Sequence, residues 1–148
     1  MLLWIYESAC IIGYGTSFKS EKNAFEKALQ LAKEMGIVVE SIRLDKYYSA
    51  EAYVNICQEY LGKEIIPFII PKKNIATLGV GEWCSMVYRF TDNPKVFLEE
   101  YFQRNQSESG FAEDKKRTGW RFAQKREERI DTAYGLTTLW HNLFWVGA

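Results

Sequence analysis

Short apolar runs near the start of the chain predict two β-strands. Leu2 to Tyr6 is apolar or aromatic throughout, and Cys10 to Phe18 forms a second such run after the polar pair Glu7-Ser8. Runs of this length favour strands, and the short polar interval favours a hairpin. Gly13 and Gly15 weaken the second strand and indicate a bulge or a place where another segment comes close to the backbone.

A helical pattern follows from Ser20 to Met35. Ser20 is a favourable N-cap residue, and Gly36 is a typical helix terminator. Apolar residues recur every three or four positions, as expected for the buried face of a helix. These residues are Ala24, Phe25, Ala28, Leu29 and Ala32.

A strand is predicted from Ile37 to Leu44, and Asp45 stands at its carboxyl end. Open α/β sheets place their functional groups at such strand ends. The ordinary alternative for Asp45 is a helix cap or turn former. Ser49 is positioned to cap a helix that runs to Leu61. The residues expected to face inward are Tyr53, Ile56, Cys57 and Tyr60.

Glu64 to Ile70 is a further predicted strand, and Pro67 within it indicates an edge strand or a bulge because proline has no N–H to donate. A short helix is expected from Glu82 to Phe90. Asn93-Pro94 then provides a cap and a first-turn proline for a long helix that continues through Lys115.

Asp131 is predicted to cap a last helix. The apolar residues of this helix are expected to pack on the body of the protein, and they are Leu136, Leu139, Trp140, Leu143 and Phe144. The order of strand, strand, helix, strand, helix, strand and helices is typical of an α/β protein. A chain of 148 residues is long enough for one domain with a core.

Composition narrows the class of protein only slightly. Lys+Arg and Asp+Glu number 19 each, whereas a DNA-binding protein is usually basic overall. Cys10, Cys57 and Cys84 are odd in number and widely spaced, which indicates buried thiols in a reducing, cytoplasmic compartment. No apolar run reaches the roughly 18 residues of a membrane span, and the first residues do not resemble a signal peptide.

Four residues in the predicted long helix form one narrow stripe. At about 100° per residue they fall at roughly 0°, −60°, −20° and −40° around the helix. They are Tyr101, Arg104, Glu108 and Lys115. An acid on this partly apolar side needs a partner, either a base or a metal ion. The simplest alternative is an amphipathic helix whose polar groups pair with one another.

The spacing Tyr101-x2-Arg104-x3-Glu108-x6-Lys115 resembles the Tyr-Arg-Glu-Lys signature of DDE transposases from bacterial and archaeal insertion sequences. In that family the Glu is the third metal-binding carboxylate of an RNase H-like domain. The segment that begins Asp45-Lys-Tyr-Tyr resembles the family's second-Asp motif. The Asn142-Leu143 pair resembles an ending that is structural in these proteins, and we expect His141 beside it to be a core histidine.

The resemblance implies an RNase H-like mixed sheet flanked by helices. That fold has three antiparallel strands before its first helix, with the first catalytic Asp on the first strand. Here only two apolar runs precede Ser20, and no Asp occurs before Asp45. We therefore expect residues 1–148 to form a single RNase H-like catalytic domain that is truncated at its N-terminus, lacks the first strand and is inactive in isolation.

By this resemblance, Asp45 and Glu108 are the catalytic residues and ligands of Mg²⁺ or Mn²⁺, in a two-metal site that needs the missing first carboxylate. Tyr101, Arg104 and Lys115 would position DNA phosphates. Lys115 also begins a basic cluster that could contact DNA, and Lys72 and Lys73 could extend that surface. The cluster consists of Lys115, Lys116, Arg117, Arg121, Lys125, Arg126 and Arg129. A solvated charged turn is the alternative.

The leading hypothesis is a transposase catalytic region for metal-dependent DNA cleavage and strand transfer. Its partners would be double-stranded DNA, both transposon ends and target, together with a second copy in a homodimer, and no membrane. The first alternative is an inactive remnant that acts as a DNA-binding or oligomerisation module. The second is an unrelated α/β protein in which the motif match is a coincidence.

Overall fold

The computed structural model describes residues 2–4, 10–73, 75, 81–105, 109–110, 112–113, 116 and 124–146. These residues form a mixed α/β structure, as predicted. The chain divides into two compact units. The first unit comprises Met1–Ile37 and Asn105–Ala148, and the second comprises Val38–Arg104. Among the described helices, none has the length and apolar content needed to cross a bilayer.

The sheet of the first unit pairs β1 (Leu2–Trp4) with β2 (Ile11–Tyr14) in antiparallel orientation. Strand β2 is shorter than the predicted run from Cys10 to Phe18, but its pairing with β1 confirms the predicted association. Leu3 pairs with Gly13, and the register shifts before the next pair, Trp4 with Ile11. The irregularity lies beside Gly13, where the glycines predicted a bulge or a close approach.

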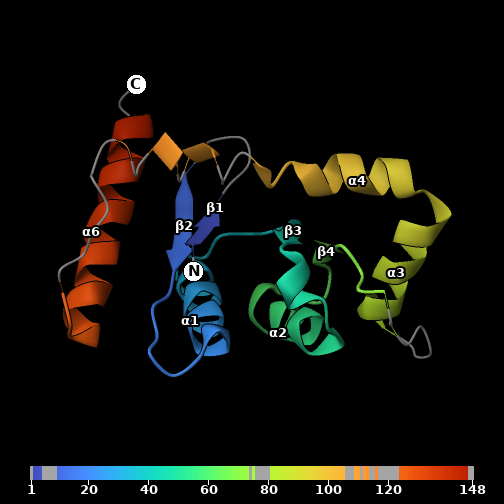
Figure 1. Ribbon diagram of the computed structural model, residues 1–148, viewed down its shortest axis with the longest axis horizontal. Coiled ribbons are helices and arrows are strands. Elements are labelled where there is room, and N and C mark those ends of the chain that lie inside the picture. Colours follow the sequence, from blue (N-terminus) through green and yellow to red (C-terminus); the bar gives the residue numbers. More distant parts are fainter. Residues whose placement is uncertain are drawn as a thin grey trace. The chain divides into compact units, whose positions relative to one another are not determined.

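Helix α1 (Glu21–Glu34) has the predicted caps. The Ser20 hydroxyl accepts a hydrogen bond from the Asn23 N–H at 3.1 Å, and Gly36 adopts a left-handed φ of 68°. The predicted inward residues Ala24, Phe25, Ala28, Leu29 and Ala32 are all buried. Helix α1 packs against β2 (Figure 1).

The close packing of α1 on the end of β2 depends on Gly15. A Cβ added at Gly15 would lie 1.9 Å from the carbonyl oxygen of Ala24 and 3.0 Å from the amide nitrogen of Ala28. Both atoms are backbone, so the helix itself would have to move. The close approach predicted for the glycines is therefore present at Gly15.

Helix α6 (Glu127–Val146) is joined to β2 through its Asn142 side chain. The amide nitrogen of Asn142 donates to the Ile11 carbonyl at 2.8 Å, and the Asn142 oxygen accepts from the Ile11 N–H at 2.8 Å. His141, beside it, is buried and lies near Trp145. These contacts confirm the predicted core histidine and the structural role of Asn142.

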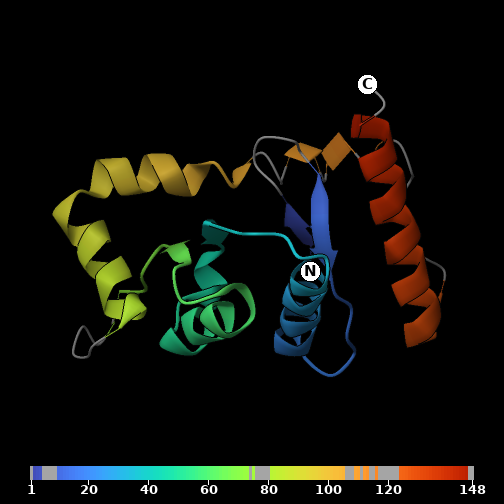
Figure 2. The same cartoon turned by 180° about the vertical axis from the view of Figure 1, so that it is seen from behind.

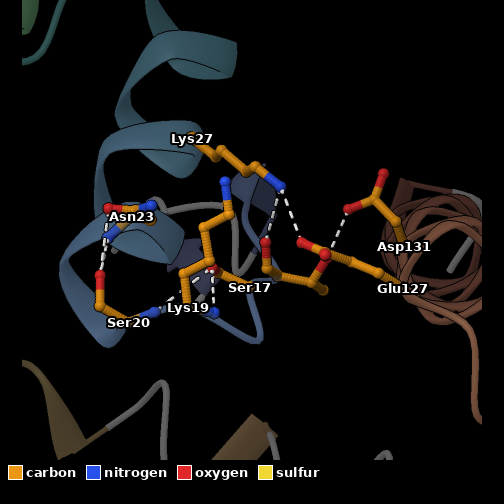
Figure 3. Close-up of polar contacts among 8 residues, drawn as sticks. Ser17, Lys19, Ser20, Asn23, Lys27, Glu127 and Asp131 are labelled. Atoms are coloured by element: carbon orange, nitrogen blue, oxygen red, sulfur yellow. Dashed lines mark hydrogen bonds and ion pairs between the residues drawn. The ribbon is translucent and has the colours of Figure 1, made fainter.

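The start of α6 makes a second polar junction with the segment between β2 and α1. Asp131 does not cap the helix as predicted, because α6 begins at Glu127; its carboxylate instead accepts a hydrogen bond from the Thr16 hydroxyl at 2.6 Å. Lys27 of α1 donates to the Thr16 carbonyl at 2.9 Å and forms an ion pair with Glu127 at 3.4 Å (Figure 3). Desolvation, and secondarily the charge of Asp131, raises the pKa of Tyr14.

The apolar residues of α6 do not pack on the body of the protein, contrary to the prediction. Asn142 bonds to Ile11 of β2, Asp131 bonds to Thr16 just after that strand, and His141, next to Asn142, is buried. The residues predicted to be buried lie elsewhere on the helix and are exposed: Leu136, Leu139, Trp140, Leu143 and Phe144.

In the second unit, β3 (Ser41–Leu44) and β4 (Ile66–Ile69) pair in parallel. Helix α2 (Glu51–Leu61) provides the connection between them. Pro67 pairs with Ile42 in a sheet whose described strands are only these two, which agrees with the predicted edge strand. The α2 residues Ile56 and Cys57 are buried as expected, whereas Tyr53 and Tyr60 are half-buried.

The predicted capping role of Ser49 is wrong. The N-cap of α2 is Ala50, which makes no side-chain cap, while the Ser49 hydroxyl accepts a hydrogen bond from the Lys72 N–H at 3.2 Å. Asp45 instead caps a short 3₁₀ helix, η1 (Lys46–Tyr48). The Ser49 hydroxyl is therefore used in a contact with Lys72, a residue distant in the sequence, and not in the N-cap of α2 that the local sequence predicted.

Helices α3 (Glu82–Asp92) and α4 (Pro94–Phe102) pack against β4 (Figure 2). Phe97 of α4 is buried between Phe68 and Phe90, with ring centroids 5.2 and 5.3 Å away. Asn93 caps α4 and Pro94 occupies its first turn, as predicted.

The prediction of one continuous helix through Lys115 is wrong, because α4 ends at Phe102. The N–H groups of Gln103 and Arg104 bond to the carbonyls three residues earlier, at 3.3 and 3.2 Å. Bonds of this kind tighten the last turn of a helix. No glycine or proline marks this end, so the sequence pattern gave no local signal for it.

We expect Asn142→Ala to destabilise the protein by about 1–3 kcal/mol, since it leaves the N–H and the carbonyl of Ile11 without their partner. Urea unfolding followed by circular dichroism measures this loss. Asn55→Ala, at an exposed position on α2, is the control and should change stability by less than about 0.5 kcal/mol. Equal effects of the two substitutions would contradict the assignment.

Gly15→Ala should destabilise the protein by about 3 kcal/mol or more, because the added methyl group meets the backbone of α1. The matched control is Gly36→Ala, where nothing lies within 4 Å and only the left-handed φ of 68° opposes a side chain. That control should lose about 1 kcal/mol. A smaller loss for Gly15→Ala than for Gly36→Ala, measured by the same denaturation, would refute the close approach.

Candidate functional site

The carboxyl ends of the parallel strands bring a carboxylate and two lysines to the same edge of the sheet. Asp45 follows β3 directly, and Lys72 and Lys73 come shortly after β4. The Lys72 backbone bonds to the Ser49 hydroxyl, and its Nζ donates to the Tyr47 carbonyl at 3.4 Å. The segment after β4 is thus held against the turn after β3.

Asp45 uses its two carboxylate oxygens differently. Oδ1 accepts a hydrogen bond from the Tyr47 N–H at 2.9 Å, which fixes the start of η1. Oδ2 lies 3.3 Å from Nη2 of Arg104 in an ion pair. The Asp45 side chain is 52% exposed, so the carboxylate remains open to solvent. Both oxygens are therefore engaged within the protein, while about half of the side chain stays accessible to solvent.

Arg104 reaches Asp45 from the turn that ends α4. Its side chain is 24% exposed, and its guanidinium lies 5.3 Å from the centroid of the Tyr101 ring. Tyr101 is buried, so it acts as a platform under Arg104. Two residues of the predicted stripe therefore lie together, although the helix ends between them.

Arg43 holds this arrangement in place from the middle of β3. Its Nη2 pairs with the Glu100 carboxylate at 2.6 Å, its Nε donates to the Glu100 carbonyl at 2.9 Å, and Nη1 donates to the Ser41 hydroxyl at 2.8 Å. A hydrogen bond between a guanidinium and a carboxylate is strengthened by the two charges, and the bond to the backbone carbonyl adds direction. They fasten the end of α4, which leads into Arg104, to the strand that leads into Asp45.

Sequence reasoning did not identify the Arg43 and Glu100 pair. The sequence did contain one indication of a role for Arg43. This charged residue lies inside the predicted strand Ile37 to Leu44, two positions before Asp45. Side chains two apart on a strand share a face. The partner of Arg43 lies far away in the sequence, and no periodicity points to it.

The predicted site residues divide into three groups. Asp45, Tyr101 and Arg104 come together in the second unit. Lys116 is exposed in the first unit, as are Lys125, Arg126 and Arg129 from the same predicted basic cluster. The other predicted residues lie outside the described residues: Glu108, Lys115, Arg117 and Arg121.

Among the described residues, no group of three or more His, Cys, Asp or Glu side chains is arranged to hold a metal ion. Asp45 is an exposed carboxylate of the type that Mg²⁺ and Mn²⁺ prefer, but one of its oxygens accepts the Tyr47 N–H and the other pairs with Arg104. Glu100, four residues before Arg104, is engaged by Arg43. The described part of the site thus offers one carboxylate and would need others to bind a metal ion firmly.

Comparison with known proteins relates the chain to an insertion-sequence transposase. It is 43% identical over 138 residues to a protein of Archaeoglobus fulgidus described as a probable transposase for insertion sequence element ISA1214. The alignment includes 93% of this chain but 41% of that protein, so the chain spans about two fifths of its relative's length. No protein-family model and no solved structure matches the chain. The identity supports a relationship between this chain and the transposases of insertion sequences.

Proposed function

We propose that this chain is the C-terminal part of the RNase H-like catalytic domain of a DDE transposase, a cytoplasmic protein that cleaves and joins the DNA of an insertion sequence. The observation that supports it most is the 3.3 Å ion pair between Asp45 and Arg104. These residues belong to two separate motifs of the proposed family and lie far apart in the sequence. A coincidental match of either motif would not require their side chains to meet.

The order of elements also supports this proposal. An antiparallel strand pair precedes α1, and a parallel pair connected by α2 follows it. In the proposed fold a further strand precedes β1 and pairs with it antiparallel. Within the described residues β1 pairs only with β2, so its other edge has backbone groups able to accept such a strand. That strand would bring the first carboxylate.

Asp45 and Glu108 would hold Mg²⁺ or Mn²⁺ together with the carboxylate of the added strand. The bound ions would activate the attacking hydroxyl or water and stabilise the leaving oxygen. Arg104 neutralises Asp45 in the described state, which lowers the repulsion between this carboxylate and a DNA phosphate. Once a cation takes that role, the guanidinium of Arg104 is available to bind phosphate bidentately.

Positive charge around Asp45 would favour the approach of DNA. Lys46, Lys72 and Lys73 are exposed at this edge of the sheet. Tyr101 would act indirectly, since it is buried beneath Arg104. The basic cluster that includes Lys115, Lys116, Arg117 and Arg121 is the second proposed contact with the DNA backbone, and a homodimer would place two transposon ends together.

The alternative is a DNA-binding or oligomerisation module without cleavage activity. Basic side chains support this function, because Arg104, Lys72 and Lys73 can bind phosphates without any metal ion. The chain also spans about two fifths of its relative, so it could serve as one module of a larger assembly. Binding and cleavage experiments separate the two functions.

Arg104→Ala should weaken binding to a duplex carrying the terminal inverted repeat of the element that encodes this protein. The loss of one phosphate contact should also reduce the slope of log affinity against log salt by about 1. Fluorescence anisotropy at several salt concentrations measures both. Lys95→Ala, at an exposed position near the start of α4, should change neither quantity. Unchanged affinity and slope for Arg104→Ala would remove its assigned role.

Asp45→Asn should abolish metal-dependent cleavage when the chain is joined to a segment that supplies the first carboxylate. Asparagine can still accept the Tyr47 N–H, so folding and DNA binding should be retained. Cleavage of a labelled duplex in Mg²⁺ or Mn²⁺ is the measurement, and Asp92→Asn, at the exposed end of α3, is the control. If Asp45→Asn cleaves at the rate of the unsubstituted protein, Asp45 is excluded as a metal ligand. If the unsubstituted protein binds DNA but does not cleave it, the DNA-binding module without cleavage activity is favoured.

A further inference from the structure

Tyr47 places an exposed aromatic ring close to the carboxylate of Asp45. Its N–H donates to Oδ1 of Asp45 at 2.9 Å, so the two residues are held together just after β3. Tyr47 is 55% exposed, whereas the next residue, Tyr48, is buried. Partial exposure is common for a tyrosine, so the role of Tyr47 depends on how its ring is held and on what surrounds it.

Contacts to both the backbone and the ring hold Tyr47 in place. Its carbonyl accepts a hydrogen bond from Nζ of Lys72 at 3.4 Å, on the other side of the residue from the bond to Asp45. Its ring meets that of Tyr48 edge to face, with centroids 5.3 Å apart, and Tyr48 meets Tyr53 in the same way at 5.0 Å. An edge-to-face contact covers at most one face of a ring. The contact with Tyr48 therefore leaves a face of the Tyr47 ring for a further partner.

The surroundings of Tyr47 are basic. Lys46, Lys72 and Lys73 are all exposed at this edge of the sheet. The negative charge of Asp45 is partly offset by its ion pair with Arg104. An exposed aromatic ring among cations is the combination with which proteins bind single-stranded nucleic acid, because the bases stack on the ring and the cations follow the phosphates.

We propose that Tyr47 binds an unpaired base of the DNA at this edge by stacking on it. Bases inside a duplex have both faces covered by their neighbours, so a protein ring can stack on a base only where that base is unpaired or out of the duplex. The DNA bound beside Asp45 therefore carries unpaired nucleotides. This inference rests on the proposed function, since it takes DNA as the ligand at this edge.

A stacked base also fixes the position of its phosphate. Only a sugar separates the base of a nucleotide from its phosphate, so a base on Tyr47 holds that phosphate near Asp45 and the lysines. Because Tyr47 is bonded to Asp45 through its backbone, the stacked base and the carboxylate keep a constant relation. Orientation of this kind is how a binding residue contributes to a reaction without taking part in the chemistry.

The test compares the affinity of the full chain for a blunt duplex and for the same duplex with a short unpaired overhang on either strand. Fluorescence anisotropy without divalent metal ions measures binding in the absence of cleavage. We expect the overhang duplex to bind more tightly. Tyr47→Ala should weaken its binding by about tenfold, the value of one base–aromatic stack, and should change binding of the blunt duplex by less than about twofold. The salt dependence should not change, because no phosphate contact is lost.

Two further variants separate stacking from folding and from general apolar contact. Tyr47→Phe keeps the flat ring and should bind the overhang duplex like the unsubstituted chain. Tyr47→Leu keeps apolar bulk without an aromatic face and should lose affinity as Tyr47→Ala does. The matched control is Tyr88→Ala, which removes a tyrosine of α3 that is 63% exposed and should change neither affinity.

The outcomes distinguish this inference from the proposed function. Equal affinity for the two duplexes, or an overhang preference that Tyr47→Leu retains, overturns the stacking role while binding of the blunt duplex still supports the proposed function. A chain that binds neither duplex overturns the proposed function and the stacking role together.

Discussion

Each sheet described in this chain pairs only two strands, and two strands leave a row of backbone groups on each outer edge. An isolated pair is also marginally stable in water. The helices compensate for both deficits in the first unit. Helix α1 covers β2 so closely that Gly15 can have no side chain, and α6 supplies the Asn142 amide in place of a neighbouring strand at Ile11. The fold of this unit thus depends on elements from opposite ends of the sequence.

The second unit also contains a described sheet of two strands, but these strands are parallel. Parallel strands need a crossover, and α2 provides it. A consequence is that the residues after β3 and β4 meet at one edge, where Asp45 and Lys72 lie near the turn of η1. Arg43 and Glu100 then fix the end of α4 to β3, so that Arg104 reaches Asp45. The geometry of the candidate site follows from the sheet topology and from the two bonds that Arg43 makes to Glu100.

The sequence predicted helix ends correctly where residues next to the end determine it. Ser20 and Gly36 delimit α1 because a hydroxyl cap and a left-handed glycine act within a few residues. The predictions failed where a distant group competes for the same side chain. Ser49 accepts from Lys72 instead of capping α2, and Asp131, which lies inside α6 because the helix begins at Glu127, accepts from Thr16. Periodicity identified the apolar face of α6 but wrongly placed it against the body of the protein, because the spacing of apolar residues does not show which side of a helix its neighbours cover.

For the candidate site, resemblance to a known family selected Asp45 and Arg104, and the structure brings them together. The stripe geometry was only partly correct, because α4 ends at Phe102 and tightens before Arg104. The ion pair between Arg43 and Glu100 could not be predicted, because a contact between a strand and a distant helix produces no periodic pattern in the sequence.

The Asn142 amide also limits how the first unit can associate through its sheet. Cross-β fibrils grow by repeated addition of strands, and each molecule in such a fibril needs two strand edges that can pair. At Ile11 both backbone groups on one edge are already taken by a side chain on α6. A strand from another molecule therefore cannot pair with β2 at Ile11 unless the two Asn142 bonds are first broken.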